Sequence, residues 1–357
     1  MYSIDLSYSI VPSEAAQTGF GNPLIRELEA IESEKSLKMA AQKLGVSYRY
    51  FWGQIEFWEE KFGQKLVIRE QGRPAQLSPL GTKLLWAEKS VMARYSVQIE
   101  KLRTELASAV AAACDPNADI ITVAGCYDPW LSKLPAALFS DGIIADLKFS
   151  TSREGLVSLH AGEADMAGFN FPRGSGPDST AAGTFAHLID PASVGLCRFA
   201  SRTQGLAVAA GNPLGIEQLS DVIDRSLRYA GRPVGTGTHV LLRDLLGREG
   251  LPGDLLDGTK IVETSHRGVA LAVASGRADA GLCVADAAQA ARIDFVPLAV
   301  EDYYLAWRLD RVPASLPRLL KHLRTAQWQM TASAFAGMSG EDCGACVDQK
   351  QAFGWWS

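Results

Sequence analysis

The sequence lacks the features of a membrane or secreted protein. No apolar run approaches the roughly 20 residues of a membrane-spanning helix, and the N-terminus, MYSIDLSYSIVPSE, has neither the basic start nor the apolar core of a secretory signal. The chain has no excess of positive charge either, because its formal net charge is -5 at pH 7. We therefore expect a cytoplasmic protein with no membrane partner, in which any affinity for nucleic acid resides in a local basic face.

Signatures of metal binding and catalysis are absent as well. The six cysteines include one pair at CxxC spacing, Cys343 and Cys346, and no second pair that would complete a four-ligand zinc site. A nucleophile elbow, an HExxH motif and a dinucleotide-binding glycine fingerprint are all missing from their proper contexts. We expect no catalytic residue, no metal and no cofactor, and cysteines that are reduced and serve mostly in packing.

A helix-turn-helix pattern is present at residues 36–62, SLKMAAQKLGVSYRYFWGQIEFWEEKF. Apolar residues at three- and four-residue spacing predict a first helix with one buried face and a second helix that buries Phe51 and Ile55. Gly45 suits the end of the first helix, and Ser47 can cap the second. The following residues, GQKLVIREQGRPAQLSPLGTKLL, predict a short strand, a turn, a return strand and a new helix. That order is the layout of a winged helix.

The opening turns of a recognition helix contact base edges, and basic residues of a wing contact phosphates. The residues expected to contact DNA are Ser36, Ser47, Tyr48, Arg49, Tyr50, Gln54, Arg69 and Arg73. An ordinary amphipathic helical hairpin beside a β-hairpin would show the same periodicity. Residues 22–82, through AAQKLGVSYRYFWGQIEFWEEKFG and LSPLGTKLL, resemble the winged-helix domain of the molybdate-responsive ModE regulators and, more distantly, LysR-type regulators. The resemblance implies a transcription regulator that binds a double-stranded DNA operator.

A long helix follows the predicted wing. The segment GTKLLWAEKSVMARYSVQIEKLRTELASAVAAA has few helix breakers and an apolar stripe, which predicts one helix of roughly thirty residues. Such a stripe requires a partner, and a second copy of the chain is the economical one. We expect a homodimer with two recognition helices for a two-fold operator, and a tetramer of two such dimers is the alternative assembly.

From about residue 118 the pattern changes to alternating strands and helices, which predicts parallel sheets covered by helices. A weak repeat, LHAGEADMAG and VASGRADAG, suggests two similar lobes. Residues 120–330 resemble the periplasmic-binding-protein-like domain fused to ModE-type winged helices. The segments that carry this resemblance are SREGLVSLHAGEADMAGFNF, RTQGLAVAAGNPLGIEQLSDV, GRPVGTGTHVLLRDLL and ETSHRGVALAVASGRADAGLCVADAA. It implies two lobes joined by crossover strands, which we place near 203–206 and 295–298, with a small ligand between the lobes.

The expected fold is α/β with an N-terminal winged helix-turn-helix, a long linker helix and a two-lobed type 2 periplasmic-binding-protein-like effector domain. The winged helix-turn-helix would cover 1–82, the linker and dimerisation helix 83–117, the effector domain 118–330 and a C-terminal tail 331–357. Within the effector domain, lobe 1 would comprise 118–204 and 298–330, and lobe 2 would comprise 205–297.

Ligands of open α/β sheets bind beyond the carboxyl ends of strands, where hydroxyls and free N–H groups at helix starts can hold an anion. The candidate ligand-binding residues are Cys126, Tyr127, Asp128, Thr151, Ser152, Arg153, Phe169, Asn170, Thr203, Gly235, Thr236, Gly237, Thr238, Thr264 and His266. For each of these loops, simple capping of the next helix is an equally good interpretation.

The nature of the effector stays open. The resemblance implies an oxyanion, molybdate or tungstate, held mainly by neutral donors. Cys126 takes a place where a hydroxyl would suit an oxyanion better, and Phe169 and Asn170 could make one wall less polar. A small organic anion, a carboxylate such as formate or a sulfonate, is therefore the alternative. A sensor that uses its winged helix only for protein contacts is a further alternative.

Overall fold

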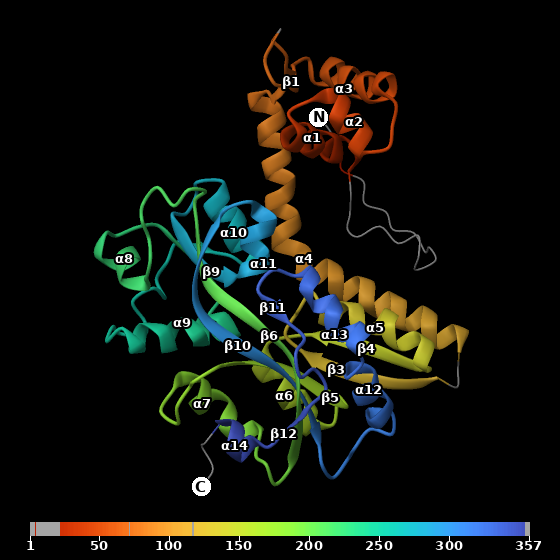
Figure 1. Cartoon of the computed structure of the whole chain (residues 1–357), viewed down its shortest axis with the longest axis vertical. Coiled ribbons are helices and arrows are strands. Elements are labelled where there is room, and N and C mark those ends of the chain that lie inside the picture. The colour runs from red at the N-terminus through yellow and green to blue at the C-terminus, as the bar shows by residue number, and fades with distance from the viewer. Residues whose placement is uncertain (1–3, 5–21, 71, 116–117, 354–357) are drawn as a thin grey trace. The chain divides into compact units, whose positions relative to one another are not determined.

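The computed structural model describes residues 4, 22–70, 72–115 and 118–353. The chain divides into two compact units, residues 1–92 and 93–357, and each is described by itself (Figure 1). The N-terminal stretch examined for a secretory signal lies outside the described residues, as do parts of the expected boundaries at 1–21, 116–117 and 354–357. Among the described helices, none combines the length and the apolar character needed to span a bilayer.

The first unit is a winged helix-turn-helix. Helix α1 (Pro23–Glu34) begins after Asn22, whose side chain accepts a hydrogen bond from the backbone N–H of Leu24. Helix α2 (Leu37–Lys43) and helix α3 (Tyr48–Phe62) are capped by Ser36 and Ser47. Gly45, with φ +70°, makes the turn between them, a backbone conformation that glycine adopts without strain.

The wing consists of two short antiparallel strands, β1 (Val67–Ile68) and β2 (Gln76–Leu77), with Val67 paired to Leu77. Glu59 of α3 fixes the start of the wing, because its buried carboxylate accepts hydrogen bonds from the backbone N–H groups of Leu66 (2.9 Å) and Val67 (3.2 Å). The fully buried Phe51 and Ile55 of α3 pack in the core of this unit, as the spacing predicted.

Helix α4 (Pro79–Cys114) has 36 residues, a little more than predicted, and belongs to both units. A proline suits its first position, because the N–H that proline lacks would have no partner there. Near its start Gly81 packs against the wing: a Cβ at this position would lie 2.4 Å from the carbonyl oxygen of Leu66. Only glycine lets the helix and the wing approach this closely.

The second unit is built on one mixed sheet rather than on two separate ones. Its strand order is β4-β3-β5-β10-β6-β9-β7-β8, with β11 and β12 added to β6. The strands are β3 (Asp119–Gly125), β4 (Ile143–Phe149), β5 (Met166–Pro172), β6 (Val194–Val208), β7 (Tyr229–Gly231), β8 (Ile261–Val262), β9 (Ala280–Val284), β10 (Asp294–Arg308), β11 (Met338–Ser339) and β12 (Cys346–Val347). The strands β3, β4 and β5 are parallel, as are β7, β8 and β9, so each half has the predicted α/β character.

Helices cover both halves of this sheet. They are α5 (Leu134–Leu138), α6 (Ser152–Ala161), α7 (Thr180–Phe185), α8 (Leu219–Asp224), α9 (Gly237–Arg248), α10 (His266–Ala274), α11 (Ala285–Ala291), α12 (Leu316–Leu323), α13 (Ala326–Met330) and α14 (Gln349–Phe353). Separate apolar cores form in the two halves, one around Trp130, Phe199 and Tyr303 and another around Leu206, Leu241 and Leu282. The two lobes therefore have independent interiors.

The long antiparallel strands β6 and β10 join the two lobes and run side by side (Figure 1). The segments predicted as crossovers lie directly opposite each other in this pair, because Leu206 is paired with Val296 and Gly205 with Pro297. On its other side β6 changes partner. It pairs with β12 at 196–197, with β11 at 201–202 and with β9 from Gln204 to Val208.

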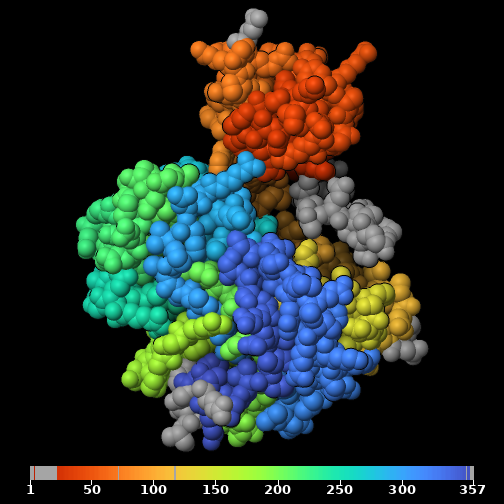
Figure 2. Space-filling model, in the orientation of Figure 1, coloured from red at the N-terminus to blue at the C-terminus, as the bar shows by residue number. Residues whose placement is uncertain are grey.

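The segment that we expected as a tail, from residue 331, is part of the sheet as far as it is described. Strands β11 and β12 both pair with β6, and Phe353 of α14 stacks edge-on against Phe171 and Tyr304. Figure 2 shows the residues near the C-terminal end, in the darker blues, gathered on one face of the unit.

Candidate nucleic-acid interface and ligand site

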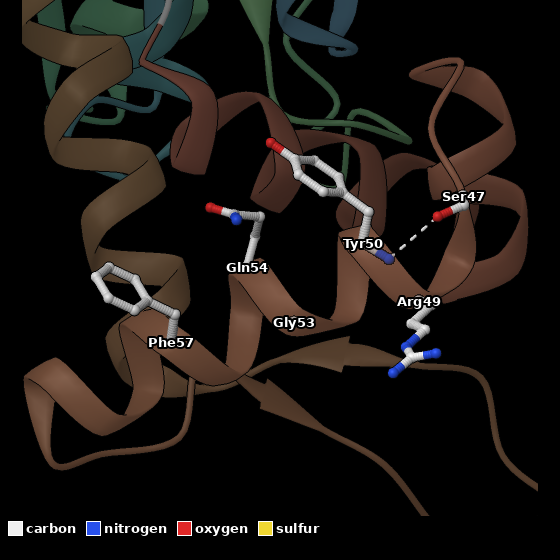
Figure 3. Close-up of a pocket in the computed structure, with 6 residues that line it drawn as sticks. All are labelled: Ser47, Arg49, Tyr50, Gly53, Gln54 and Phe57. Atoms are coloured by element: carbon white, nitrogen blue, oxygen red, sulfur yellow. Dashed lines mark hydrogen bonds between the residues drawn. The ribbon is translucent and has the colours of Figure 1, made fainter.

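The exposed face of α3 forms a shallow hollow on the first unit. It is lined by Ser47, Arg49, Tyr50, Gly53, Gln54 and Phe57 (Figure 3). The Ser47 hydroxyl accepts a hydrogen bond from the backbone N–H of Tyr50 (3.2 Å), which fixes the start of the helix. Tyr50, which is 57% exposed, lies on one face of α3 together with Gln54 and Phe57. Phe51 and Ile55 anchor the opposite face in the core.

The electrostatics of this surface suit a polyanion. Arg49 is the basic residue of the first two turns of α3, and no acidic residue occurs in the helix before Glu56. Within the described residues no carboxylate lies within ion-pair distance of Arg49. The positive end of the helix dipole adds to the same field.

Two arginines of the wing differ in their availability. Arg69 donates a hydrogen bond to the Tyr48 hydroxyl (3.2 Å) and lies 4.4 Å from the centre of the Trp52 ring, so it is held beside α3. Arg73 instead forms an ion pair with Glu70, which offsets its charge. Ser36 is engaged in capping α2 through the backbone N–H of Met39 (3.4 Å).

A polar cluster lies where the two lobes of the second unit meet. From lobe 1, the Asn170 side-chain amide donates to Cys126 Sγ (2.6 Å), and the Asn170 backbone N–H donates to Ser152 Oγ (3.3 Å). From lobe 2, a Cβ at Gly237 would lie 3.9 Å from Ser152 Oγ. The N-termini of α6 and α9, which begin at Ser152 and Gly237, are thus close together across the lobes.

A buried ion-pair triad lies beside this cluster. Arg202 on β6 donates to Asp128 Oδ2 (3.0 Å) and to Glu301 on β10, and all three side chains are buried. Burial disfavours the charge of Arg202, but the two carboxylates outweigh this effect and hold its pKa above the ordinary value. The other oxygen of Asp128 accepts from the backbone N–H groups of Trp130 and Leu131, so Asp128 organises its loop.

Four side chains in this region, Asn170 of the cluster among them, carry buried polar atoms without a hydrogen-bond partner among the described residues. They are both amide atoms of Gln204, Asn170 Oδ1, Arg232 Nε and His266 Nδ1. Burial, together with the charge of Arg202, lowers the pKa of Arg232 to about 10. Burial and the neighbouring arginines also lower the pKa of His266 well below its usual range, so its imidazole is neutral at pH 7. Buried polar atoms without partners are costly, and a ligand that supplied the missing hydrogen bonds would remove that cost.

The sequence-predicted ligand residues divide into several groups. Cys126, Ser152, Asn170 and Gly237 come together as described, and His266 lies near Arg232 and Arg202. Several others act as caps or as structural contacts. Thr151 and Thr236 cap α6 and α9, and the Thr264 hydroxyl donates to the carbonyl oxygen of Arg94 in α4 (2.8 Å).

The remaining predicted residues do not reach the cluster through a recorded contact. Phe169 packs in a core beside Phe185 and Tyr304, so it does not make a wall of the site. Burial raises the pKa of Tyr127 to about 12, and its ring packs on Phe149. Arg153 and Gly235 are exposed, Thr238 is buried, and the Thr203 N–H donates to the carbonyl oxygen of Gly337.

Sequence reasoning missed Arg202, Gln204, Arg232 and Glu301. A signal for two of them is visible in retrospect, because Arg202 and Gln204 are two positions apart, on one face of a strand that ends in the apolar run 206–208. Buried arginine and glutamine side chains on a strand require polar partners, and that requirement indicates a polar site.

Comparison with known proteins identifies both units. Residues 136–322 match the PBP superfamily domain, and residues 24–82 match the bacterial regulatory helix-turn-helix proteins of the lysR family. The chain belongs to the PBP superfamily, and its N-terminal unit is a LysR-family helix-turn-helix. These matches support the expectation that it is not an enzyme, but they do not confirm the ModE-type, molybdate-specific part of the resemblance.

Two curated proteins share parts of the sequence. The uncharacterized protein YvgK of Bacillus subtilis (strain 168) is 33% identical over 149 residues, 42% of this chain and 44% of that protein. The HTH-type transcriptional regulator ArgP of Aeromonas salmonicida is 35% identical over 88 residues, 25% of this chain and 26% of that protein. The chain therefore spans less than half the length of these relatives.

Solved structures of full-length proteins are also similar to this chain, at low identity and low TM-score. BenM is 20% identical with a TM-score of 0.42, covering 88% of this chain and 98% of its own. CbnR in complex with its target DNA is 19% identical with a TM-score of 0.40, covering 84% and 97%. LysG of Corynebacterium glutamicum with bound effector Arg is 21% identical with a TM-score of 0.38, covering 85% and 96%.

Proposed function

We propose that this chain is a ligand-responsive transcription regulator of the LysR type that binds double-stranded DNA. The observation that carries the proposal is the exposed face of α3, where Arg49, Tyr50 and Gln54 line a hollow on a helix-turn-helix unit. An aromatic, an amide and a guanidinium in the opening turns of a recognition helix can contact base edges and phosphates. A winged helix that only contacts proteins is the competing function.

The test is DNA binding by the full-length protein, measured with fragments from upstream of its own gene at several salt concentrations. Arg49→Ala should weaken binding by roughly 1–3 kcal/mol, about five- to 150-fold. Arg248→Ala, an exposed arginine at the end of α9, is the matched control and should bind like the wild type. No specific complex with any upstream fragment would favour the protein-contact alternative.

We propose that the effector binds at the polar cluster between the lobes and is a small anion. Arg232 and the N-termini of α6 and α9 would supply the positive field, and Ser152 would supply a hydroxyl. On this arrangement the effector would bias an equilibrium between open and closed lobes, and the difference in its affinity for the two states would set the response. Molybdate and tungstate are the candidates that the ModE resemblance favours.

One form of the alternative effector, a small organic anion that also donates hydrogen bonds, is favoured by one specific observation. Gln204 is fully buried and neither atom of its amide has a partner, so whichever way the amide is turned it presents one donor and one acceptor. A metal oxyanion such as molybdate only accepts hydrogen bonds. A carboxylate that also bears a hydroxyl or amino group both donates and accepts, and it would match the glutamine completely.

A thermal-shift screen separates these effectors, because ligand that binds the folded state raises its apparent stability. The compounds are molybdate, tungstate, sulfate, formate, small sulfonates, and small hydroxy- and amino-carboxylates. Arg232→Gln should remove the response to any anion. Gln204→Leu should remove the response to a hydroxy- or amino-carboxylate but leave a response to molybdate or formate. Loss of DNA binding in these variants without effector would instead indicate a folding defect.

We propose further that the protein is a cytoplasmic homodimer that pairs through α4, with a tetramer of two such dimers as the alternative assembly. Tyr95, Leu102, Leu106 and Val110 of α4 are between 37% and 51% exposed and follow helical spacing. We retain the division into a DNA-binding domain at 1–82, a linker helix at 83–117 and an effector domain from 118, and we extend the effector domain to include the segment that pairs with β6.

A further inference from the structure

Three cysteines come together on one side of β6, outside the DNA-binding face and the polar cluster. Cys197 of β6 and Cys346 of β12 are direct partners in an antiparallel pair. Directly opposed residues point to the same face of a sheet, with Cα atoms about 4.5–5.5 Å apart. That separation lies inside the range of about 4.4–6.8 Å that a disulfide bond spans.

The packing of the neighbouring residues supports the same-face assignment. Cys197 belongs to the core formed with Phe199 and Tyr303, whereas the adjacent pair, Leu196 and Val347, faces the opposite core. The alternation between successive residues therefore places the Cys346 sulfur on the Cys197 side. Arg324, at the end of α12 on that side, donates a hydrogen bond to Cys346 Sγ (3.5 Å).

The three thiols differ in access. Cys197 and Cys343 are buried, whereas Cys346 is exposed to solvent. Burial raises the pKa of Cys343 to about 12 and raises that of Cys197 still further, with the neighbouring Cys343 and Cys346 adding to the shift at Cys197. Within the described ranges no group of three or more metal-ligating side chains is arranged to hold a metal ion. The cluster therefore suits thiol chemistry that begins at Cys346.

We propose that Cys197 and Cys346 form a reversible disulfide, which makes this pair a redox-modified site of the effector domain. The oxidant is a low-molecular-weight disulfide. The Cys346 thiolate attacks one sulfur of the oxidant, breaks its S–S bond and releases one equivalent of thiol. Cys197, after giving up its proton, then attacks the Cys346 sulfur and releases the second thiol. The oxidant is reduced by two electrons and the two cysteines are oxidised by two.

The bond would fasten β12 to the strand that joins the two lobes. Without it, β12 has two residues and a short ladder with β6, and the helix α14 follows directly. A covalent link at Cys346 would hold β12, and with it the packing of Phe353 on Phe171 and Tyr304, against local opening. Oxidation would thus stabilise the C-terminal segment of the effector domain.

The experiment exposes the full-length Cys114→Ser protein, which lacks the exposed cysteine of α4, to graded ratios of oxidised to reduced glutathione. Remaining thiols are then alkylated and the peptides are mapped by mass spectrometry. We expect a peptide that links Cys197 to Cys346, formed in proportion to the oxidised fraction and lost on addition of dithiothreitol. Hydrogen exchange over residues 344–353 should be slower in the oxidised protein.

Single variants separate the roles of the three cysteines. Cys346→Ser should abolish the linked peptide, Cys343→Ser should leave it unchanged, and Cys197→Ala should trap Cys346 as a mixed disulfide with glutathione. A Cys343–Cys346 link in the wild type, or persistence of all three free thiols under oxidising ratios, would overturn the proposal. If Cys197→Ala fails to fold, the mapping of the wild type and of Cys346→Ser still decides the question.

Discussion

Arg202 is the residue on which the junction of the two lobes most depends electrostatically. It is buried between Asp128 and Glu301, so its removal leaves two carboxylates buried without a counter-charge. Arg202→Met should therefore cost roughly 3–5 kcal/mol of stability.

Thermal unfolding of Arg202→Met measures this effect, with exposed Arg153→Met as the control. The control should unfold within about 0.5 kcal/mol of the wild type. A loss for Arg202→Met no larger than that of the control would show that the buried triad does not depend on the charge of Arg202.

Glu27 of α1 is a residue whose charged form destabilises the first unit. It is buried, one of its oxygens has no partner among the described residues, and burial raises its pKa from 4.5 to about 7. Because the folded-state pKa lies above the unfolded one, the stability of the first unit should fall as pH rises from about 4.5 to 7. The full penalty above pH 7 is about 3 kcal/mol.

Replacing this residue by Glu27→Gln should raise the unfolding temperature at pH 8 and change it little at pH 4. Glu56→Gln, an exposed residue of α3, is the matched control and should have no effect at either pH. A stabilisation of Glu27→Gln that is the same at both pH values would rule out titration as its cause.

Prediction from sequence succeeded at residues whose role is local. Ser47 caps the helix that it precedes, and Phe51 and Ile55 are buried, because capping and helical periodicity depend on neighbours a few positions away. It failed at Arg202, Gln204 and Arg232. Their polar partners, or the absence of such partners, follow from strand pairing across some hundred residues, which no local pattern records.

At the scale of elements, two helical glycines differ in the space around them, so replacement by alanine should have opposite effects on stability. A Cβ at Gly81 of α4 would lie 2.4 Å from the Leu66 carbonyl oxygen, whereas a Cβ at Gly53 of α3 meets no atom within 4 Å. Gly81→Ala should push the wing away and destabilise the unit by roughly 1–3 kcal/mol. Gly53→Ala should stabilise it by about 0.5–1 kcal/mol, because alanine favours the helix.

Thermal unfolding of the two variants tests the pair directly. Both are the same chemical change in a helix, so each is the control for the other. If Gly81→Ala proved neutral, the close packing of α4 on the wing would be contradicted. DNA affinity should fall for Gly81→Ala through the displaced wing.

The elements that sequence predicted least well are the ones that join others. The predicted crossovers covered only 203–206 and 295–298, whereas β6 and β10 each extend over 15 residues. Gly205 and Pro297, which usually interrupt strands, face each other at a register irregularity and allow both strands to continue. Strands of two residues such as β11 and β12 have no periodicity to detect, so the C-terminal segment looked like a tail.

At the scale of the whole molecule, the exposed apolar side chains of α4 bear on assembly. The double variant that carries Leu102→Glu and Leu106→Glu should convert the proposed dimer to a monomer, because a carboxylate between two packed helices is not solvated. Light scattering after gel filtration measures the mass, and Glu105→Gln on the same helix is the control. An unchanged dimer would place the subunit contact elsewhere. A dimer that dissociates should also lose affinity for a two-fold operator.

The change of partner along β6 has a mechanical consequence. Up to Thr203 the strand is flanked by β10 and by the C-terminal segment, and from Gln204 onward it is flanked by β10 and β9. Each lobe thus pairs with its own part of β6. The boundary between the two parts is therefore a position for a hinge. Gln204, with its unpartnered amide, stands at that boundary. A ligand that contacts Gln204 would act at this hinge. There a small displacement of β6 would rotate one lobe relative to the other and move their far ends the most.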